Sequence, residues 1–188
     1  VSTAAVLWAA LESDLVVPLN EDYKFAGNAE KLVNARFRFL HDKVQQAAYS
    51  LTPEHERMAL QLKTGRLLLA HATEADLDAQ LFGILAQFNQ AAALIEDPAE
   101  RAQLVALNLR AGAKAKASSA FATAATLLQH AKDLLAADVW QTDPESATQL
   151  HLELAEAHYL AGNFELAEKL YAPSIAAATT PLAKASLC

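Results

Sequence analysis

Hydrophobic side chains recur every three to four residues along most of the chain, which is the spacing of amphipathic helices. The first such stretch covers residues 3–17 and includes Leu7, Leu11 and Leu15. It stops at Pro18, because proline lacks the backbone N–H that a helix interior requires. We therefore expect a helix over residues 3–17.

Alternation of aromatic and polar residues replaces the helical spacing in the next segment. Residues 23–25 (Tyr-Lys-Phe) and 37–39 (Phe-Arg-Phe) both alternate, and Gly27-Asn28 between them is a turn signal. We expect these runs to pair as a β-hairpin, followed by a helix from about Asp42. A helix, a hairpin and a helix in this order are found at the end of a winged-helix domain, so residues 1–50 are interpreted as the end of a winged-helix-like lobe.

Helical spacing returns after Ser50 and continues toward the end of the chain. Thr52-Pro53 is a helix-start signal, because Thr caps free N–H groups and Pro fits the first turn. The Asp-Pro pairs at residues 97–98 and 143–144 repeat this signal. The helices expected in this part begin at about residues 53, 74, 98, 119, 144 and 163.

The last two pairs of expected helices resemble each other. Five positions recur with a shift of about 43 residues: Gly112, Phe121, Ala124, Leu128 and Ala131 correspond to Ala155, Phe164, Ala167, Tyr171 and Ser174. Small residues at this spacing let paired helices approach closely, and the large ones fill the groove to the next pair, as in tetratricopeptide repeats. We predict a mainly α fold in which residues 51–188 form a tetratricopeptide-like α-solenoid of antiparallel helix pairs. An unrelated helical bundle is the alternative.

Composition and charge exclude several classes of function. With 15 Lys and Arg against 22 Asp and Glu, the formal net charge is −7, whereas nucleic-acid-binding modules are usually basic. The single Cys excludes a disulfide framework and a Cys-based zinc site. No apolar run approaches the roughly 20 residues of a membrane helix, and no signal peptide is recognisable. We expect a cytoplasmic protein with no nucleic-acid partner and no membrane insertion.

The two ends of the sequence favour a piece of a longer polypeptide. The chain begins at Val1 rather than Met, and residues 181–188 read as the opening of another helix, with Pro181 in its first turn. The alternative is a complete chain whose initiator Met has been removed.

Residues with catalytic or cofactor-binding chemistry are sparse. Neither the pattern G-x-x-x-x-G-K-[ST] nor G-x-G-x-x-G occurs, and the metalloprotease pattern H-E-x-x-H is absent. Carboxylate pairs such as Asp76 and Asp78 read as solvated helix faces. We therefore predict that the chain is not an enzyme and carries no cofactor or metal of its own. An enzyme with its site in the helical core is a minor alternative.

The predicted solenoid would offer a concave groove to a peptide or to a helix of a protein partner. The first helix of each pair would line most of this groove. Four polar residues on those helices are the interaction-groove candidates: Asn108, Lys114, Gln149 and Glu153.

One histidine differs from the other five in its position. His41 follows the second expected strand at the point where a helix begins, and free backbone N–H groups at a helix start suit an anionic phosphate. Asp42 can cap the same helix. A capping or solvent-facing role for His41 is the alternative to contact with a ligand.

A family resemblance appears in the same stretch. Residues 39–50 (Phe-Leu-His-Asp-Lys-Val-Gln-Gln-Ala-Ala-Tyr-Ser), preceded by residues 19–25 (Leu-Asn-Glu-Asp-Tyr-Lys-Phe), resemble the region after the nucleotide-binding core of large bacterial signalling proteins. Those proteins join a serine/threonine-kinase-like domain, a STAND-class AAA-type ATPase, a long helical repeat region, a GAF domain and often a sensor histidine kinase. Residues 65–69, 108–112 and 152–156 resemble their helical region.

The resemblance implies a role for the histidine. Residues 40–42 (Leu-His-Asp) are similar to the Met-His-Asp motif of STAND ATPases, whose His contacts the phosphate of ADP. It therefore implies that His41 contacts nucleotide in a parent protein that binds ATP or ADP, with Asp42 as its neighbour. The sequence departs from the motif at Leu40, where Met is usual, and the nucleotide-binding core lies outside this chain.

The implied function is a non-catalytic regulatory and protein-interaction segment of a signal-transduction ATPase or kinase. It would couple the binding of a protein, a peptide or a neighbouring domain to a nucleotide-dependent switch. The alternative is a free-standing tetratricopeptide-like adaptor that binds peptides.

Overall fold

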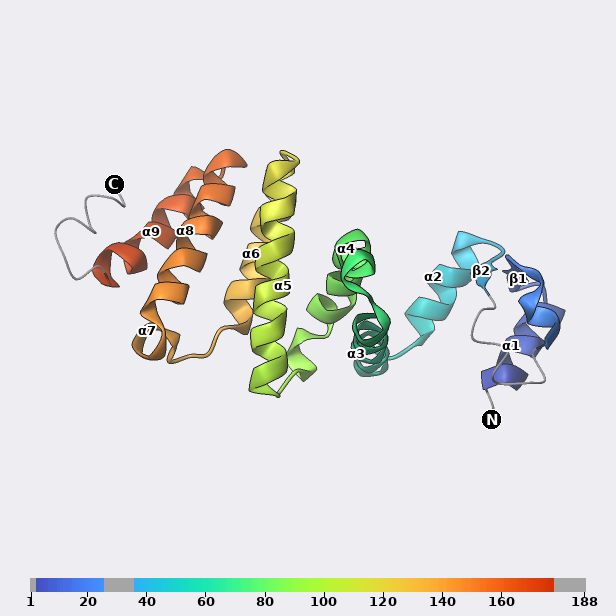
Figure 1. Cartoon of the computed structure of the whole chain (residues 1–188). Coiled ribbons are helices and arrows are strands. Elements are labelled where there is room, and N and C mark those ends of the chain that lie inside the picture. Colours follow the sequence, from blue (N-terminus) through green and yellow to red (C-terminus); the bar gives the residue numbers. More distant parts are fainter. Residues whose placement is uncertain (1–2, 26–35, 178–188) are drawn as a thin grey trace. The chain divides into compact units, whose positions relative to one another are not determined.

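The computed structural model describes residues 3–25 and 36–177 (Figure 1). The chain divides into two compact units, residues 1–57 and 58–188, and each is described by itself. Helices make up most of the described residues, and one two-stranded antiparallel sheet accompanies them. The predictions of a mainly helical chain and of a small antiparallel pair of strands are thus confirmed.

The first helix is shorter than the sequence pattern predicts. Helix α1 (Thr3–Glu12) ends in a Schellman motif, in which Asp14 adopts a positive φ of 52°. The N–H of Leu15 donates to the carbonyl of Ala10 at 2.9 Å, and the N–H of Asp14 donates to that of Leu11 at 3.1 Å. The prediction of a helix through residue 17 is therefore wrong, because the left-handed residue turns the chain and the hydrophobic run continues as a strand.

That strand is β1 (Val16–Pro18), which pairs with β2 (Phe37–Phe39) so that Val17 lies opposite Arg38. The second predicted strand is confirmed, but the first is wrong, because residues 23–25 belong to the 3₁₀-helix Glu21–Phe25. Three alternating residues are too few to distinguish a strand from a tight helical turn. The predicted turn at residues 27–28 lies outside the described residues.

Helix α2 (Asp42–Leu51) begins at the predicted residue. At its end the hydroxyl of Thr52 donates to the carbonyl of Ala48 at 2.9 Å, so Thr52 is the C-cap of α2. The sequence had instead predicted Thr52 as the N-cap of the next helix. The next helix, α3 (Glu54–His71), contributes its first turn to the same unit. There Arg57 donates to the carbonyl of Tyr49 at 3.0 Å and lies over the Tyr49 ring.

The second unit consists of α3 from Met58 onward and the helices that follow it. These are α4 (Glu74–Gln90), α5 (Pro98–Ala117), α6 (Phe121–Leu134), the short α7 (Val139–Thr142), α8 (Pro144–Leu160) and α9 (Phe164–Ala177). A 3₁₀-helix (Ala92–Leu94) follows α4. The six predicted helix starts agree with the structure to within two residues, whereas the short α7 and the 3₁₀-helix after α4 were not predicted. The helix predicted to open at residues 181–188 lies outside the described residues.

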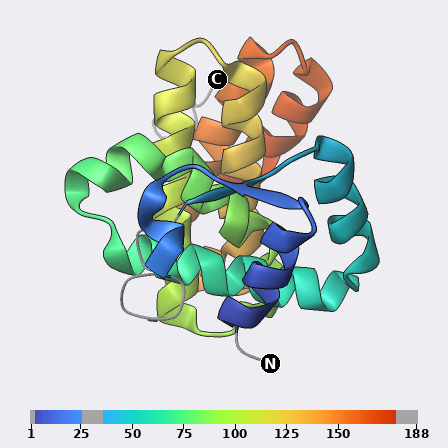
Figure 2. The ribbon, with the colours of Figure 1, turned by 90° about the vertical axis from the view of Figure 1, so that its right-hand side faces the viewer.

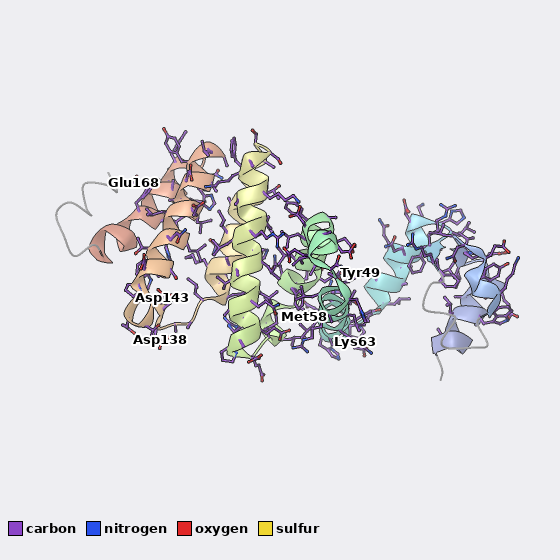
Figure 3. All side chains as sticks on the ribbon, viewed as in Figure 1. Tyr49, Met58, Lys63, Asp138, Asp143 and Glu168 are labelled. Atoms are coloured by element: carbon purple, nitrogen blue, oxygen red, sulfur yellow. The ribbon has the colours of Figure 1, made fainter. Side chains whose placement is uncertain are left out.

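Side-chain caps explain why three of these starts could be predicted. Thr73 and Asp76 form a reciprocal capping box at the start of α4. The carboxylate of Asp97 accepts from the N–H groups of the first turn of α5, and Asp143 accepts from the N–H of Ser146 at the start of α8 (Figure 3).

Helices α5 and α6 form one helical hairpin and α8 and α9 another, and α6 packs against α8 (Figures 1 and 2). Each hairpin turns through a residue with positive φ, Ser119 at 57° and Gly162 at 83°. The core runs through these helices and α4. Its largest buried apolar side chains are Leu81, Ile84, Leu85, Phe88, Ile95, Leu104, Leu128, Leu150 and Leu154.

Small residues lie where paired helices approach closely. A Cβ atom added to Gly112 on α5 would lie 2.8 Å from Cγ of Leu128 on α6, closer than packed atoms tolerate. In the second hairpin Ala155 and Ala167 are 0% and 2% exposed. Small residues at these positions therefore allow the paired helices to pack closely.

Candidate interaction surface

His41 occupies the N-cap position of α2 with extended backbone angles, φ −134° and ψ 140°. Its carbonyl accepts from the N–H groups of Val44 and Gln45, but its side chain makes no capping hydrogen bond. Asp42 is the first residue of the helix, and both side chains are exposed. The imidazole is therefore placed beside a helix start and accessible to a ligand, and its contact with nucleotide stays a prediction.

The four interaction-groove candidates do not share one open groove. Asn108 is fully buried, at 0% exposure. Its amide exchanges two hydrogen bonds with the amide of Asn89 on α4, at 2.9 and 3.1 Å, and donates a third to the carbonyl of Leu104 at 3.0 Å. The prediction that Asn108 lines a groove is wrong, because this amide pair joins α4 to α5 inside the core.

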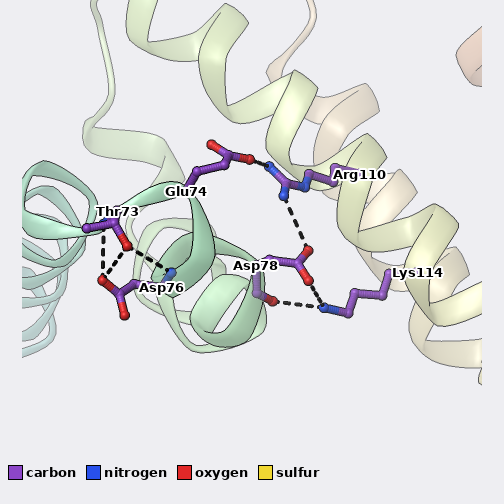
Figure 4. A network of polar contacts seen from close by, with 6 residues as sticks. All are labelled: Thr73, Glu74, Asp76, Asp78, Arg110 and Lys114. Atoms are coloured by element: carbon purple, nitrogen blue, oxygen red, sulfur yellow. Dashed lines mark hydrogen bonds and ion pairs between the residues drawn. The ribbon is translucent and has the colours of Figure 1, made fainter.

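Lys114 lies in a polar network between α4 and α5 (Figure 4). Its ammonium donates to the carbonyl and to the carboxylate of Asp78, at 2.8 and 3.0 Å. Arg110 donates to the carboxylate of Glu74 at 2.7 Å and to that of Asp78 at 3.3 Å. The hydrogen bond and positive charge of Lys114, with a smaller contribution from Arg110, hold the pKa of Asp78 below its ordinary value of 3.8.

Glu153 is also engaged within the molecule. Lys116 on α5 donates to the carboxylates of Glu153 and Glu156 on α8, and its side chain is 18% exposed. Burial alone would lower the pKa of Lys116, but its hydrogen bonds to both glutamate carboxylates outweigh this effect, so the pKa is raised. Of the four candidates, Gln149 is the one that is exposed.

A third polar contact joins α5 to α3. The guanidinium of Arg66 donates to both carboxylate oxygens of Glu100, each at 2.7 Å, and these hydrogen bonds hold the pKa of Glu100 below its ordinary value of 4.5. We refer to the residues that link α5 to α3, α4 and α8 in this way as the α5 ion pairs: Arg66, Glu74, Asp78, Glu100, Arg110, Lys114, Lys116, Glu153 and Glu156. These ion pairs link neighbouring helices, and they engage Lys114 and Glu153, which were predicted to line a groove for a partner.

The structure also contains a hollow that the sequence reasoning missed. It has a volume of about 760 Å³ and lies between α6, α8 and α9. Three histidines that the sequence gave no reason to connect line it: His130, His151 and His158. Among the described residues no group of three or more His, Cys, Asp or Glu has the arrangement of a metal site.

Two of these histidines have ring atoms that are buried in the protein. His151 is 6% exposed, its Nδ1 lies 2.8 Å from the carbonyl of Ala147, and its ring centre lies 4.8 Å from that of Trp140. His158 has a buried Nδ1 with no hydrogen-bond partner among the described residues. No short-range motif connects the three histidines, because His130 lies on α6, whereas His151 and His158 lie two turns apart on α8.

Within the described part of the chain, no helix has both the length and the apolar character needed to cross a membrane. No family model matches the chain, and no solved structure matches it.

The sequence is similar to a protein named hybrid signal transduction histidine kinase G from Dictyostelium discoideum. The two are 28% identical over 159 residues, a match that covers 72% of this chain and 5% of that kinase. The chain thus spans a small part of the length of the relative. It is distantly similar to a segment of a large signal-transduction protein, and this similarity suggests a signalling-related role.

Proposed function

We propose that the chain is a non-catalytic regulatory and protein-interaction segment of a larger signal-transduction protein. Residues 1–50 form the end of a winged-helix-like lobe, and residues 51–188 form tetratricopeptide-like helix pairs. In this proposal the parent protein contains a STAND-class AAA-type ATPase that binds ATP or ADP, and His41 contacts the nucleotide. The matched relative comes from Dictyostelium discoideum, so the proposal does not depend on a bacterial source.

The observation that carries the proposal is that small residues occupy equivalent buried positions in two successive hairpins. In the first, Gly112 on α5 admits Leu128 of α6. In the second, the equivalent Ala155 on α8 is fully buried and Ala167 on α9 nearly so. Stacked helical hairpins with small residues at such positions form extended surfaces suited to binding other proteins.

The exposure of the first unit supports its placement within a larger protein. Among the described residues between 6 and 57, no side chain is fully buried. Trp8 is 46% exposed and Tyr49 is 53% exposed, and Leu51 is 83% exposed. Large hydrophobic side chains on a surface are suited to packing against a further domain, as the proposed ATPase would supply.

The link between α2 and α3 provides a route for coupling. Only Thr52 and Pro53 separate the two helices, and Arg57 fixes the start of α3 to the end of α2 through Tyr49. We propose that a partner bound to the helical unit favours one of two states of the ATPase, and that this segment transmits the preference.

The test of the proposal is nucleotide retention by the intact parent protein carrying His41→Ala. Loss of the imidazole removes a contact to the ADP phosphate, so the variant should release ADP faster than the wild type. His55→Ala is the matched control, because His55 is also an exposed histidine near a helix start. Equal ADP retention in His41→Ala and wild type would contradict the switch role.

A free-standing peptide-binding adaptor is the second candidate, and the hollow between α6, α8 and α9 favours it because such a site needs no nucleotide core. The two candidates differ in their flanking sequence. A reading frame that continues upstream into a phosphate-binding loop supports the first, whereas a start codon next to Val1 and a stop codon after Cys188 support the adaptor.

A further inference from the structure

The hollow between α6, α8 and α9 has the size and lining of a binding site. Its volume of about 760 Å³ lies within the range of ligand pockets. Ala122, Ala125, Leu166 and Leu170 provide apolar surface, and polar side chains from all three helices surround it. The second helices of the hairpins, α6 and α9, provide most of the lining, whereas the α5 ion pairs lie on α3, α4, α5 and α8.

The charge of this lining is opposite to the charge of the chain. The chain carries a net charge of −7, but the hollow is lined by Lys132 and Lys169, together with three histidines. Among the described residues that line it, none is an aspartate or glutamate. Asp133, which follows Lys132, accepts a hydrogen bond from Gln129 at 2.7 Å.

The two lysines are available to a ligand. In the part of the chain that the structure describes, neither Lys132 nor Lys169 has an ion-pair partner, whereas Lys114 and Lys116 are each paired with carboxylates. His158 has no partner at its Nδ1, so no hydrogen bond from that atom to the protein fixes the orientation of its ring. Cationic groups beside apolar surface favour a ligand that has both carboxylates and hydrophobic side chains.

The hollow continues along α6 toward α4. A second hollow of about 420 Å³ lies between α4 and α6, and Thr126 and His130 line both. Phe82 and Leu127 add apolar surface to the second hollow. A surface that extends over α4, α6 and α9 is suited to a peptide segment rather than to a compact small molecule.

We propose that this surface binds an acidic peptide segment of a partner protein, with hydrophobic side chains in the hollows and carboxylates at Lys132 and Lys169. A nucleic acid is disfavoured, because the net charge of the chain repels a long polyanion. The inference rests on the proposed interaction role and deepens it by naming the chemistry of the partner. It places that partner on the second helices rather than on the first.

The test is selection of peptides from a displayed library of random dodecapeptides on the immobilised 188-residue chain. We expect the selected peptides to be enriched in Asp and Glu together with Leu, Ile, Val or Phe. Binding of a selected peptide, measured by fluorescence anisotropy, should weaken about tenfold or more in Lys132→Glu/Lys169→Glu. The control is Lys43→Glu/Lys63→Glu, which changes the net charge equally at two exposed lysines, Lys43 on α2 and Lys63 on α3. Figure 3 labels Lys63.

Three results would overturn the inference: no enriched peptides, enriched peptides without acidic residues, or equal weakening in both double variants. If the charge reversal prevents folding, Lys132→Gln/Lys169→Gln provides the comparison, with circular dichroism to confirm helix content. The proposed nucleotide switch is tested separately, because ADP retention by His41→Ala does not depend on this surface. Failure of one experiment therefore leaves the result of the other intact.

Discussion

At the scale of single residues, two glycines in helix interiors distinguish the effect of packing on stability from the effect of helix propensity. Gly112 has Leu128 in the space that a Cβ would occupy, whereas a Cβ at Gly83 on α4 would meet nothing within 4 Å. Replacing an exposed helix-interior glycine by alanine stabilises a protein by about 0.5–1 kcal/mol. Overpacking a core costs about 1–3 kcal/mol.

We therefore expect Gly83→Ala to raise the free energy of unfolding by about 0.5–1 kcal/mol. Gly112→Ala should lower it by about 1 kcal/mol, because the contact with Leu128 outweighs the gain in propensity. Urea denaturation of both variants followed by circular dichroism measures the difference. A stabilisation by Gly112→Ala equal to that by Gly83→Ala would show that α5 and α6 are not in close contact there.

The buried amide pair gives the second prediction at this scale. Asn108→Ala removes a fully buried side chain and leaves the amide of Asn89 without its partner, so we expect a loss of about 2–3 kcal/mol in unfolding free energy. In Asn89→Ala/Asn108→Ala the losses should not add, since both single changes break the same pair. Gln149→Ala, at an exposed position, is the control and should change stability little. A neutral Asn108→Ala would contradict the structural role of this residue.

The sequence could not reveal this role, because polar residues usually lie on the surface and nothing local links two asparagines that are 19 residues apart. The same reasoning applies to Lys114 and Glu153, whose partners lie on other helices. His41 differs, because its position at the start of a helix follows from the residues around it.

At the scale of elements, helix starts could be predicted where a side chain caps them, as Asp97 and Asp143 do for α5 and α8. The end of α1 could not be predicted, because an aspartate takes the left-handed position that a glycine usually signals. The first strand could not be predicted either, because the hydrophobic residues of β1 continue the helical spacing of the apolar residues in α1.

The α5 ion pairs make the association of helices dependent on pH. Hydrogen bonds from Lys114 and Arg66 lower the pKa values of Asp78 and Glu100 in the folded chain. A carboxylate whose pKa is lower in the folded state stabilises that state above its unfolded pKa, and this stabilisation is lost as the pH falls through the folded pKa. The unfolding free energy should therefore decrease as the pH is lowered from about 5 to below 4.

The measurement is the urea midpoint as a function of pH for the wild type and for Asp78→Asn/Glu100→Gln. The variant should be less stable at pH 7 and should show a shallower decrease toward low pH. High salt should reduce the difference, because these groups are partly exposed and screened. Parallel pH profiles for the wild type and the variant would exclude a contribution from these ion pairs.

At the scale of the whole molecule, composition and periodicity were sufficient to predict a mainly helical chain and the order of its helices. They were not sufficient to locate the hollow between α6, α8 and α9, because His130, His158 and Lys169 come from three helices and no spacing in the sequence joins them. The acidic net charge of the chain also concealed it, since the charge is a sum over residues that lie on different faces.

The regulatory role depends on a nucleotide site that includes His41, so the most direct measurement is the rate at which the intact parent protein releases ADP. For His41→Ala we expect release at least about tenfold faster than for the wild type, within the range of coupling between sites in allosteric proteins. His55→Ala should release ADP at the wild-type rate. Identical release from wild type, His41→Ala and His55→Ala would contradict a nucleotide contact by His41 and the regulatory role that depends on it.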